Sequence, residues 1–272
     1  MTAMERESPR GESVGLHRIG GSRSTDPALE ILEIGAAVRS LRLRDGQGTV
    51  RNVVLGNYDQ AAYDDGVEYF GATVGRYANR IAGGRFVLGE TSYTIPANDG
   101  DNALHGGADG FHRRRWTVLN RSASSITLEL ISPADDQGFP GELRTSVTYA
   151  VEDSDVRIDY AAVTDAPTVI NLTNHSHFNL DGEDAGSIDD HLLQVNADRF
   201  TPVDPGLIPT GELRPVDDSA FDLREPALIG PRIRTPDSQI RLSRGIDHNF
   251  VVNGHGLRRH ACLLYTSPSP RD

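Results

Sequence analysis

Cysteine, basic charge and long apolar runs are all scarce in this sequence. The single cysteine, Cys262, excludes an internal disulfide framework and is typical of a protein from a reducing compartment. Lys and Arg number 27 against 39 Asp and Glu, which gives a net charge of -12, and no segment collects a basic stripe. That balance argues against nucleic acid and anionic membranes as partners. No apolar run reaches the roughly 18 residues that would suggest a membrane span, and residues 1–26 are polar without the apolar core of a signal peptide. We therefore expect a cytoplasmic protein with no membrane partner.

Helical periodicity is also scarce, and the 28 Gly and 15 Pro interrupt the chain throughout. Apolar and polar residues alternate over Ser125–Ser132, Glu142–Glu152 and Asp155–Val163, which is the period of half-buried antiparallel strands. Further strands are expected at 28–43, 52–56, 85–95, 115–120, 191–200, 239–243 and 248–253. Many short strands without helical partners predict an all-β fold, a large sandwich or barrel, in one domain. Residues 1–26 are expected to form a disordered leader or an edge segment.

The stretch Asn171–Leu180, NLTNHSHFNL, places His175 and His177 two residues apart. Side chains of a strand alternate between its faces, so both imidazoles would point the same way. An unperturbed histidine titrates at about pH 6.5, which makes such a pair a natural acid/base centre. Two other interpretations stay open, namely hydrogen-bonded structural histidines and a metal site.

Gly71–Phe86, GATVGRYANRIAGGRF, is rich in glycine but lacks both dinucleotide and Walker phosphate-binding spacings. Its Asn79 and Arg80 could present hydrogen-bond donors to the hydroxyls of a neutral polar ligand, or its arginines could be solvated or paired with acids. In Asn102–Phe111, His105 precedes a Gly-Gly turn that would allow close approach to a ligand.

Asp247 and His248 lie in Gly245–Val251, GIDHNFV, where a simple Asx turn before a strand is the plainer interpretation. Taken together, these segments offer neutral hydrogen-bonding groups, an Asn-Arg pair and an aspartate, which suits an uncharged polyhydroxylated ligand. No GxSxG elbow of a serine hydrolase and no HExxH zinc motif occurs, although three histidines could still ligate a metal.

Several separated blocks resemble the aldose 1-epimerase family, also called galactose mutarotase, in the family's order. The blocks are VVLG at 53–56, YFGATVGRYANRIAGGRF at 69–86, LHGG at 104–107, GFPGEL at 138–143, NLTNHSHFNL at 171–180, TPVDPGLIPTGEL at 201–213, FDLREP at 221–226 and GIDHNF at 245–250. The resemblance covers about residues 29–260 and implies an aldose 1-epimerase-like domain over 27–262. It implies a β-sandwich of large antiparallel sheets that binds an aldose in a cleft on one face.

The resemblance also implies roles for individual residues. His175 matches the general acid, and His105 matches a histidine that contacts the sugar near its ring oxygen. Asn79 and Arg80 match a substrate-binding pair, Asp247 matches an aspartate that holds sugar hydroxyls, and His177 stands where the family usually has tyrosine, so a pocket-lining role is expected for it. The implied reaction interconverts the α and β anomers of hexoses such as galactose and glucose, and it needs no metal and no cofactor.

The match to the family fails near the end of the chain. The family's general base is a glutamate in a C-terminal block, but residues 263–272, LLYTSPSPRD, do not resemble the family and have the composition of an unrelated tail. We therefore expect a truncated family member, with the question open whether a carboxylate such as Glu212 replaces the base. The alternatives are an inactive sugar-binding remnant and a histidine-based metal-binding β-sandwich. The sequence assigns neither the preferred aldose nor an oligomeric state.

Overall fold

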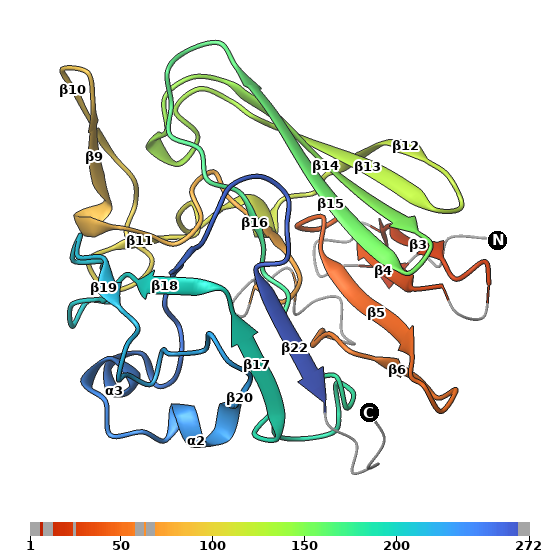
Figure 1. The fold of residues 1–272 in the computed structure, drawn as a ribbon. Helices are drawn as coiled ribbons and strands as arrows, with labels where there is room; N and C mark the ends of the chain where they lie inside the picture. The colour runs from red at the N-terminus through yellow and green to blue at the C-terminus, as the bar shows by residue number, and fades with distance from the viewer. Residues whose placement is uncertain (1–5, 8–12, 24–25, 58–62, 64–68, 266–272) are drawn as a thin grey trace. The chain divides into compact units, whose positions relative to one another are not determined.

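The computed structural model describes residues 6–7, 13–23, 26–57, 63 and 69–265 (Figure 1). The chain divides into two compact units, Met1–Glu183 and Asp184–Asp272, which are described separately. The boundary between the two units, at Glu183 and Asp184, lies inside the range 27–262 for which a single domain is expected.

The first unit contains two four-stranded antiparallel sheets. One has the order β3-β4-β5-β6, and the other has the order β12-β13-β14-β15. Their strands are β3 (Leu16–Gly20), β4 (Ala28–Leu32), β5 (Val38–Arg44), β6 (Val50–Asn52), β12 (Thr117–Arg121), β13 (Ser125–Ser132), β14 (Leu143–Glu152) and β15 (Asp155–Thr164). The three strands predicted from alternation are therefore confirmed to within one residue at each end. The alternation on β13 and β14 turns the apolar side chains into the core as expected, since Leu128 pairs with Val147 and both are fully buried.

The main core of the first unit lies between these two sheets. Leu29 and Ile31 of β4 belong to the same buried cluster as Leu128 and Val147. Complete burial of each such side chain contributes about 1.5–3 kcal/mol of hydrophobic stabilisation. The single tryptophan, Trp116, is also fully buried in this cluster. Two antiparallel sheets packed face to face confirm the predicted β-sandwich.

Shorter ladders in the first unit bring distant segments together. β7 (Thr73–Val74) pairs with β16 (Thr173–Asn174), and β8 (Arg80–Ile81) pairs with β11 (Ala103–Leu104). The range 85–95, expected as one strand, forms a hairpin of β9 (Arg85–Leu88) and β10 (Thr91–Thr94). The remaining short elements are β1 (Arg6–Glu7), β2 (Ser13–Val14) and the 3-10 turns η1 (Ala82–Gly84), η2 (Phe111–Arg113) and η3 (Asp136–Gly138).

The second unit holds two three-stranded antiparallel sheets, ordered β20-β17-β22 and β19-β18-β21. Its strands are β17 (His191–Val195), β18 (Ala197–Phe200), β19 (Arg214–Pro215), β20 (Ala227–Leu228), β21 (Phe250–Val252) and β22 (Ala261–Tyr265). The expected strand 191–200 is therefore two strands that belong to different sheets. β22 pairs along its whole length with β17 and ends three residues past the boundary expected at 262.

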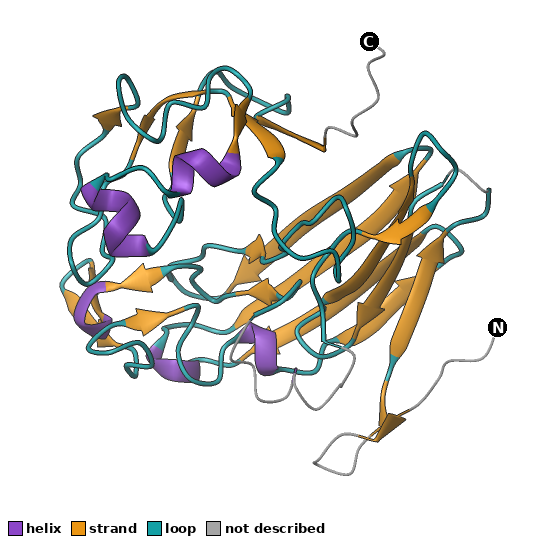
Figure 2. Cartoon of the chain, turned by 90° about the horizontal axis from the view of Figure 1, so that it is seen from below, coloured by secondary structure: helices purple, strands orange, loops and turns teal. Residues whose placement is uncertain are grey.

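Two short helices of this unit, α2 (Ile229–Ile233) and α3 (Ser238–Ser243), are purple in Figure 2. The prediction of a strand at 239–243 was wrong, because the segment is helical. The carboxylate of Asp237 accepts a hydrogen bond from the Gln239 N–H at 2.7 Å and caps the first turn, and Arg244 ends the helix in a left-handed conformation. A segment this short has too few apolar positions to separate a period of 2 from one of 3.6.

The expected leader and tail are only partly described. Residues 16–20 form β3 at the edge of the first sheet, while 1–5, 8–12, 24–25 and 266–272 lie outside the described residues. In the part of the chain that the structure describes, no helix is both long and apolar enough to span a membrane.

Candidate active site

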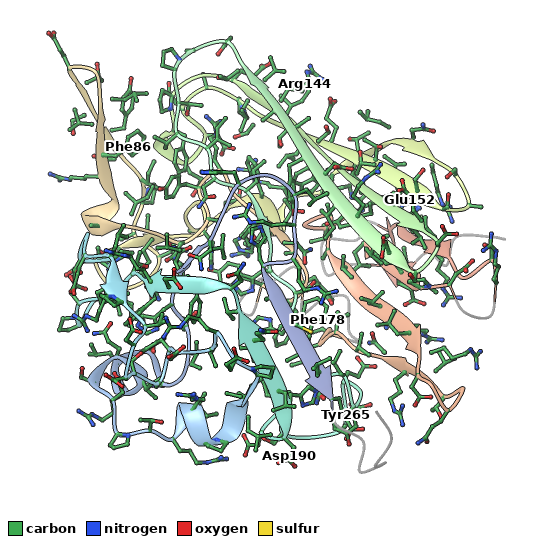
Figure 3. All side chains as sticks on the ribbon, in the orientation of Figure 1. Phe86, Arg144, Glu152, Phe178, Asp190 and Tyr265 are labelled. Atoms are coloured by element: carbon green, nitrogen blue, oxygen red, sulfur yellow. The ribbon has the colours of Figure 1, made fainter. Side chains whose placement is uncertain are left out.

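His175 and His177 follow the β7–β16 ladder in the first unit. The strand expected to carry both histidines ends at Asn174. Beyond it, the His175 N–H donates to the Ala72 carbonyl at 2.9 Å, and the His175 carbonyl accepts from the Gly71 N–H at 3.0 Å. The two imidazole rings nevertheless lie together, with centroids 5.0 Å apart. His177 is exposed, as is Phe178, which is labelled in Figure 3.

His105 is joined to this pair because the Gly-Gly turn packs closely against the backbone of Gly75. A Cβ on Gly106, whose φ is +90°, would lie 1.9 Å from the Gly75 carbonyl oxygen. Only glycine allows that approach. The His105 ring centroid lies 5.0 Å from that of His175. The structure thus brings together the three histidines, His105, His175 and His177, that the sequence predicted for the site.

The tautomer of His105 follows from its hydrogen bond. Its Nδ1 accepts the backbone N–H of Asn79 at 3.0 Å, so the ring proton is on Nε2. Burial lowers the pKa of His105 to about 3, with further contributions from His175, His112 and Arg80. At neutral pH His105 is therefore an uncharged donor through Nε2–H.

Asn79 and Arg80 lie beside His105. Asn79 is exposed in a left-handed conformation, and its Oδ1 accepts the Arg80 N–H at 2.7 Å. The Arg80 Nε–H donates to Oδ2 of Asp99 at 2.7 Å, and the Arg80 side chain is 14% exposed. The ion pair thus commits the Arg80 Nε–H to Asp99. The sequence left open whether the arginines of this stretch pair with acids, and Arg80 does.

Two aromatic residues that the sequence analysis did not assign belong to the same cluster. The ring of Tyr69 lies 4.6 Å from His105, 4.5 Å from His112 and 5.6 Å from His175 between centroids. His112 is 4% exposed, and burial lowers its pKa to about 3. Tyr69 is the first residue of one of the family-like blocks, which could have marked it as a site residue, whereas no sequence feature marked His112. We refer to the four histidines His105, His112, His175 and His177, together with Tyr69, as the imidazole cluster.

Arg76 has a structural role instead of facing a ligand. Its side chain is 1% exposed and donates to four backbone carbonyls. The acceptors are Pro140 and Gly141 at 2.9 Å and Ser132 and Pro133 at 3.1 Å, and Ser132 Oγ also accepts at 2.6 Å. Burial lowers the pKa of Arg76. The guanidinium joins the start of the Gly-rich segment to the 132–141 loop.

Asp247, His248 and Glu212 lie in the second unit, so the structure describes them apart from the imidazole cluster. Asp247 is exposed just before β21. His248 has a structural environment, with Nε2 3.1 Å from Gln239 Oε1 and its ring 4.6 Å from that of Phe221. Both carboxylate oxygens of Glu212 accept from Arg214, at 3.0 and 2.8 Å, and these hydrogen bonds lower the pKa of Glu212.

A metal site is one of the interpretations that the sequence left open for these histidines. Among the residues that the structure describes, no group of three or more His, Cys, Asp or Glu side chains is arranged to hold a metal ion. Within the imidazole cluster of the first unit, the ring of Tyr69 contacts three of the histidines.

The fold matches the crystal structure of galactose 1-epimerase from Lactobacillus acidophilus NCFM with a TM-score of 0.84 and 29% identity, covering 97% of this chain and 76% of that one. An aldose epimerase homologue from C. elegans matches with a TM-score of 0.81 and 28% identity, covering 91% of this chain and 75% of that one. The sandwich is therefore that of the galactose mutarotases.

Residues 24–271 match the family model described as aldose 1-epimerase, and this chain belongs to that family. It is 42% identical to galactose mutarotase of Mus musculus over 232 residues, which are 85% of this chain and 66% of that protein. It is 38% identical to aldose 1-epimerase of Escherichia coli (strain K12) over 227 residues, 83% of this chain and 65% of that one. The chain thus spans about two thirds of the length of these relatives.

Proposed function

We propose that this protein is an aldose 1-epimerase, an isomerase that interconverts the α and β anomers of hexoses such as galactose and glucose. The observation that carries the proposal is the pairing of His105 with His175, whose rings lie 5.0 Å apart while the Asn79 N–H holds His105 as a neutral Nε2–H donor. Relatives named galactose mutarotase and aldose 1-epimerase support it.

In the proposed reaction, His175 is the general acid. Protonated His175 donates its proton to the ring oxygen while a carboxylate base removes the proton of the anomeric hydroxyl, so that the ring opens to the free aldehyde. Rotation about the C1–C2 bond and closure on the other face give the second anomer, with the two proton transfers reversed. Each acid/base group typically contributes a factor of about 10²–10⁴. We assign no residue of this chain to the base.

The remaining site residues bind in this proposal. The Nε2–H of His105 donates to the sugar near its ring oxygen, and Asn79 and Arg80 donate to hydroxyls. His177 lines the pocket. The ligand is thus a neutral small-molecule aldose. The cytoplasmic location remains a prediction from the single cysteine.

Polarimetry tests the activity. The relaxation of freshly dissolved α-D-galactose and α-D-glucose is followed with the native chain, with His175→Gln, with His255→Gln and with buffer alone. His255 is an exposed histidine of the second unit and serves as the matched control. We expect the native chain and His255→Gln to accelerate relaxation equally, and His175→Gln to lose roughly 10²–10⁴-fold.

Two results would contradict the proposal. Relaxation no faster than in buffer, with the chain folded by circular dichroism, refutes the epimerase activity, and galactose titration observed by NMR then decides whether the chain still binds sugar. Full activity of His175→Gln refutes the assignment of the acid. Stoichiometric zinc or iron in the purified protein would favour the metal-binding alternative.

A further inference from the structure

We propose that Tyr69 is a positioning residue for His175 that holds its imidazole and stabilises the protonated form through the aromatic ring. The inference rests on the proposed function, because protonated His175 is the acid of that mechanism. It assigns to Tyr69 a role exerted through another residue and no contact with the reacting atoms.

The ring of Tyr69 is central to the imidazole cluster. Its plane is tilted by 65° to His105, 57° to His112 and 45° to His175, at centroid distances of 4.6, 4.5 and 5.6 Å. Among the described residues, Tyr69 alone has ring contacts with all three of these histidines. Edge-on and tilted arrangements at such distances are the favourable geometries for aromatic pairs.

The backbone holds Tyr69 in this place. Tyr69 has a φ of +55°, a left-handed conformation that costs a non-glycine residue about 1–2 kcal/mol. The Tyr69 carbonyl accepts the Ala72 N–H at 3.1 Å, which closes the turn. Within that turn the Gly71 carbonyl accepts the Val38 N–H at 2.9 Å and Asn174 Nδ2 at 2.8 Å. The turn is therefore fixed both to β5 and to the segment that carries His175.

The protonation states around Tyr69 give its ring a specific partner. Burial lowers the pKa of both His105 and His112 to about 3, so both are neutral at physiological pH. Of the three histidines in contact with Tyr69, His175 is the one that the proposed reaction protonates. Burial also raises the pKa of Tyr69, so the side chain stays a neutral phenol and its contribution comes from the ring.

Charged and titratable groups of the described residues act on the imidazole cluster. They include His177 beside His175, Arg80 acting on His105, Arg113 acting on His112 and Tyr69, and Asp99 acting on Tyr69. Asp99 is paired with Arg80. A cation within about 6 Å of an aromatic centroid is attracted by the ring quadrupole, and His175 satisfies that distance.

The test measures the titration of His175 directly by NMR of its ring, assigned from the signal lost in His175→Gln. The variants are Tyr69→Phe, which keeps the ring, Tyr69→Leu, which removes it, and Phe70→Leu as the matched control. Phe70 is adjacent in sequence, and its ring contacts His177 at 5.3 Å. We expect Tyr69→Leu to lower the pKa of His175 by about half a unit. Tyr69→Phe and Phe70→Leu should leave it unchanged.

A second measurement covers the case in which Tyr69→Leu does not fold. Phenylalanines with increasing ring fluorination at position 69 keep the shape of the ring and weaken its quadrupole, so the pKa of His175 should fall stepwise with fluorination. If the chain is active, the alkaline limb of its pH–rate profile, where His175 loses its proton, should move to lower pH by the same amount.

The outcomes separate this inference from the proposed function. An unchanged pKa of His175 in folded Tyr69→Leu or across the fluorinated series overturns the role of Tyr69, even if the protein is an active epimerase. A lowered pKa in Tyr69→Phe equal to that in Tyr69→Leu also overturns it, because the hydroxyl would then be responsible. An inactive chain in which the pKa falls as expected refutes the activity and leaves the role of Tyr69 standing.

Discussion

Substitution of Arg76 by methionine should destabilise the first unit strongly. Methionine fills much of the space of the arginine stem, but it removes the donor for four backbone carbonyls and for Ser132 Oγ. The bonds to the Pro140 and Ser132 carbonyls lie in fully buried surroundings. A hydrogen bond to a charged group contributes about 1.5–3 kcal/mol, and a buried acceptor left without a donor loses a similar amount.

The two buried carbonyls alone therefore predict a loss of about 3–6 kcal/mol in the free energy of unfolding. The partly buried carbonyls of Pro133 and Gly141 add less, since water can replace the guanidinium there. Such a loss is a large share of the roughly 5–15 kcal/mol of a typical domain. Arg76→Lys should recover only part of it, because a compact ammonium cannot reproduce the planar fork.

Urea unfolding followed by tryptophan fluorescence measures this effect in the first unit alone. The chain has one tryptophan, Trp116, which is fully buried in the sandwich core and donates from Nε1 to the Phe111 carbonyl at 3.1 Å. Arg85→Met is the matched control, because Arg85 belongs to the same Gly-rich stretch but is exposed on β9. It should change the free energy of unfolding by at most about 0.5 kcal/mol. Equal effects of the two substitutions would refute the structural role of Arg76.

Two further predictions use the same fluorescence assay. Gly106→Ala should cost several kcal/mol of unfolding free energy, since its Cβ would meet the Gly75 carbonyl oxygen at 1.9 Å. Gly89→Ala is the control, because Gly89 also has a positive φ but open space around it, and it should cost only about 1 kcal/mol. Similar losses at both positions would show that the close approach at Gly106 is not needed. Stability should also fall with acid: the folded-state pKa values of His105 and His112 lie at about 3, below the unfolded value of 6.5, so between these values the unfolded chain binds more protons and stability present above pH 6.5 is lost as the pH falls. From pH 6.5 to 5 each histidine should remove roughly 2 kcal/mol. His112→Gln should reduce that pH dependence, and an unfolding free energy independent of pH in this range would contradict the buried neutral state.

The sandwich was predictable because its strands are long enough to show their period. Ser125–Ser132 was predicted to the residue, and each neighbouring strand to within one. The segment at 239–243 was too short for its period to be decisive, and a cap from Asp237 made it helical. The range 191–200 broke into two strands because its two halves pair with different partners. Pairing of that kind depends on distant segments and leaves no local pattern.

The candidate site was predictable where functional residue types stand in family-like blocks, as for His105 and His175. The sequence could not show that Arg76 is buried, since its partners lie between residues 132 and 141. It could not show that His112 joins the cluster either. Both depend on contacts made across long separations in the chain. The hydrogen bond between the Asn79 N–H and His105 depends on the left-handed conformation of Asn79, which the side-chain pattern does not predict.

The buried phenol of Tyr149 on β14 connects the sandwich core to the segment that carries His175. Its hydroxyl donates to the Ala36 carbonyl at 2.8 Å and lies 3.3 Å from Thr73 Oγ1 on β7, which pairs with β16. Local loss of the β7–β16 ladder would deprive the fully buried Tyr149 hydroxyl of its Thr73 partner. The site and the core are therefore energetically coupled. By mass action, a ligand that binds only the folded site raises the unfolding free energy by RT ln(1 + [L]/Kd). Because of this coupling, the fluorescence of the buried Trp116 reports whether the site holds a ligand. Aldoses could be ranked by the unfolding free energy that each adds, even in a chain that converts none of them.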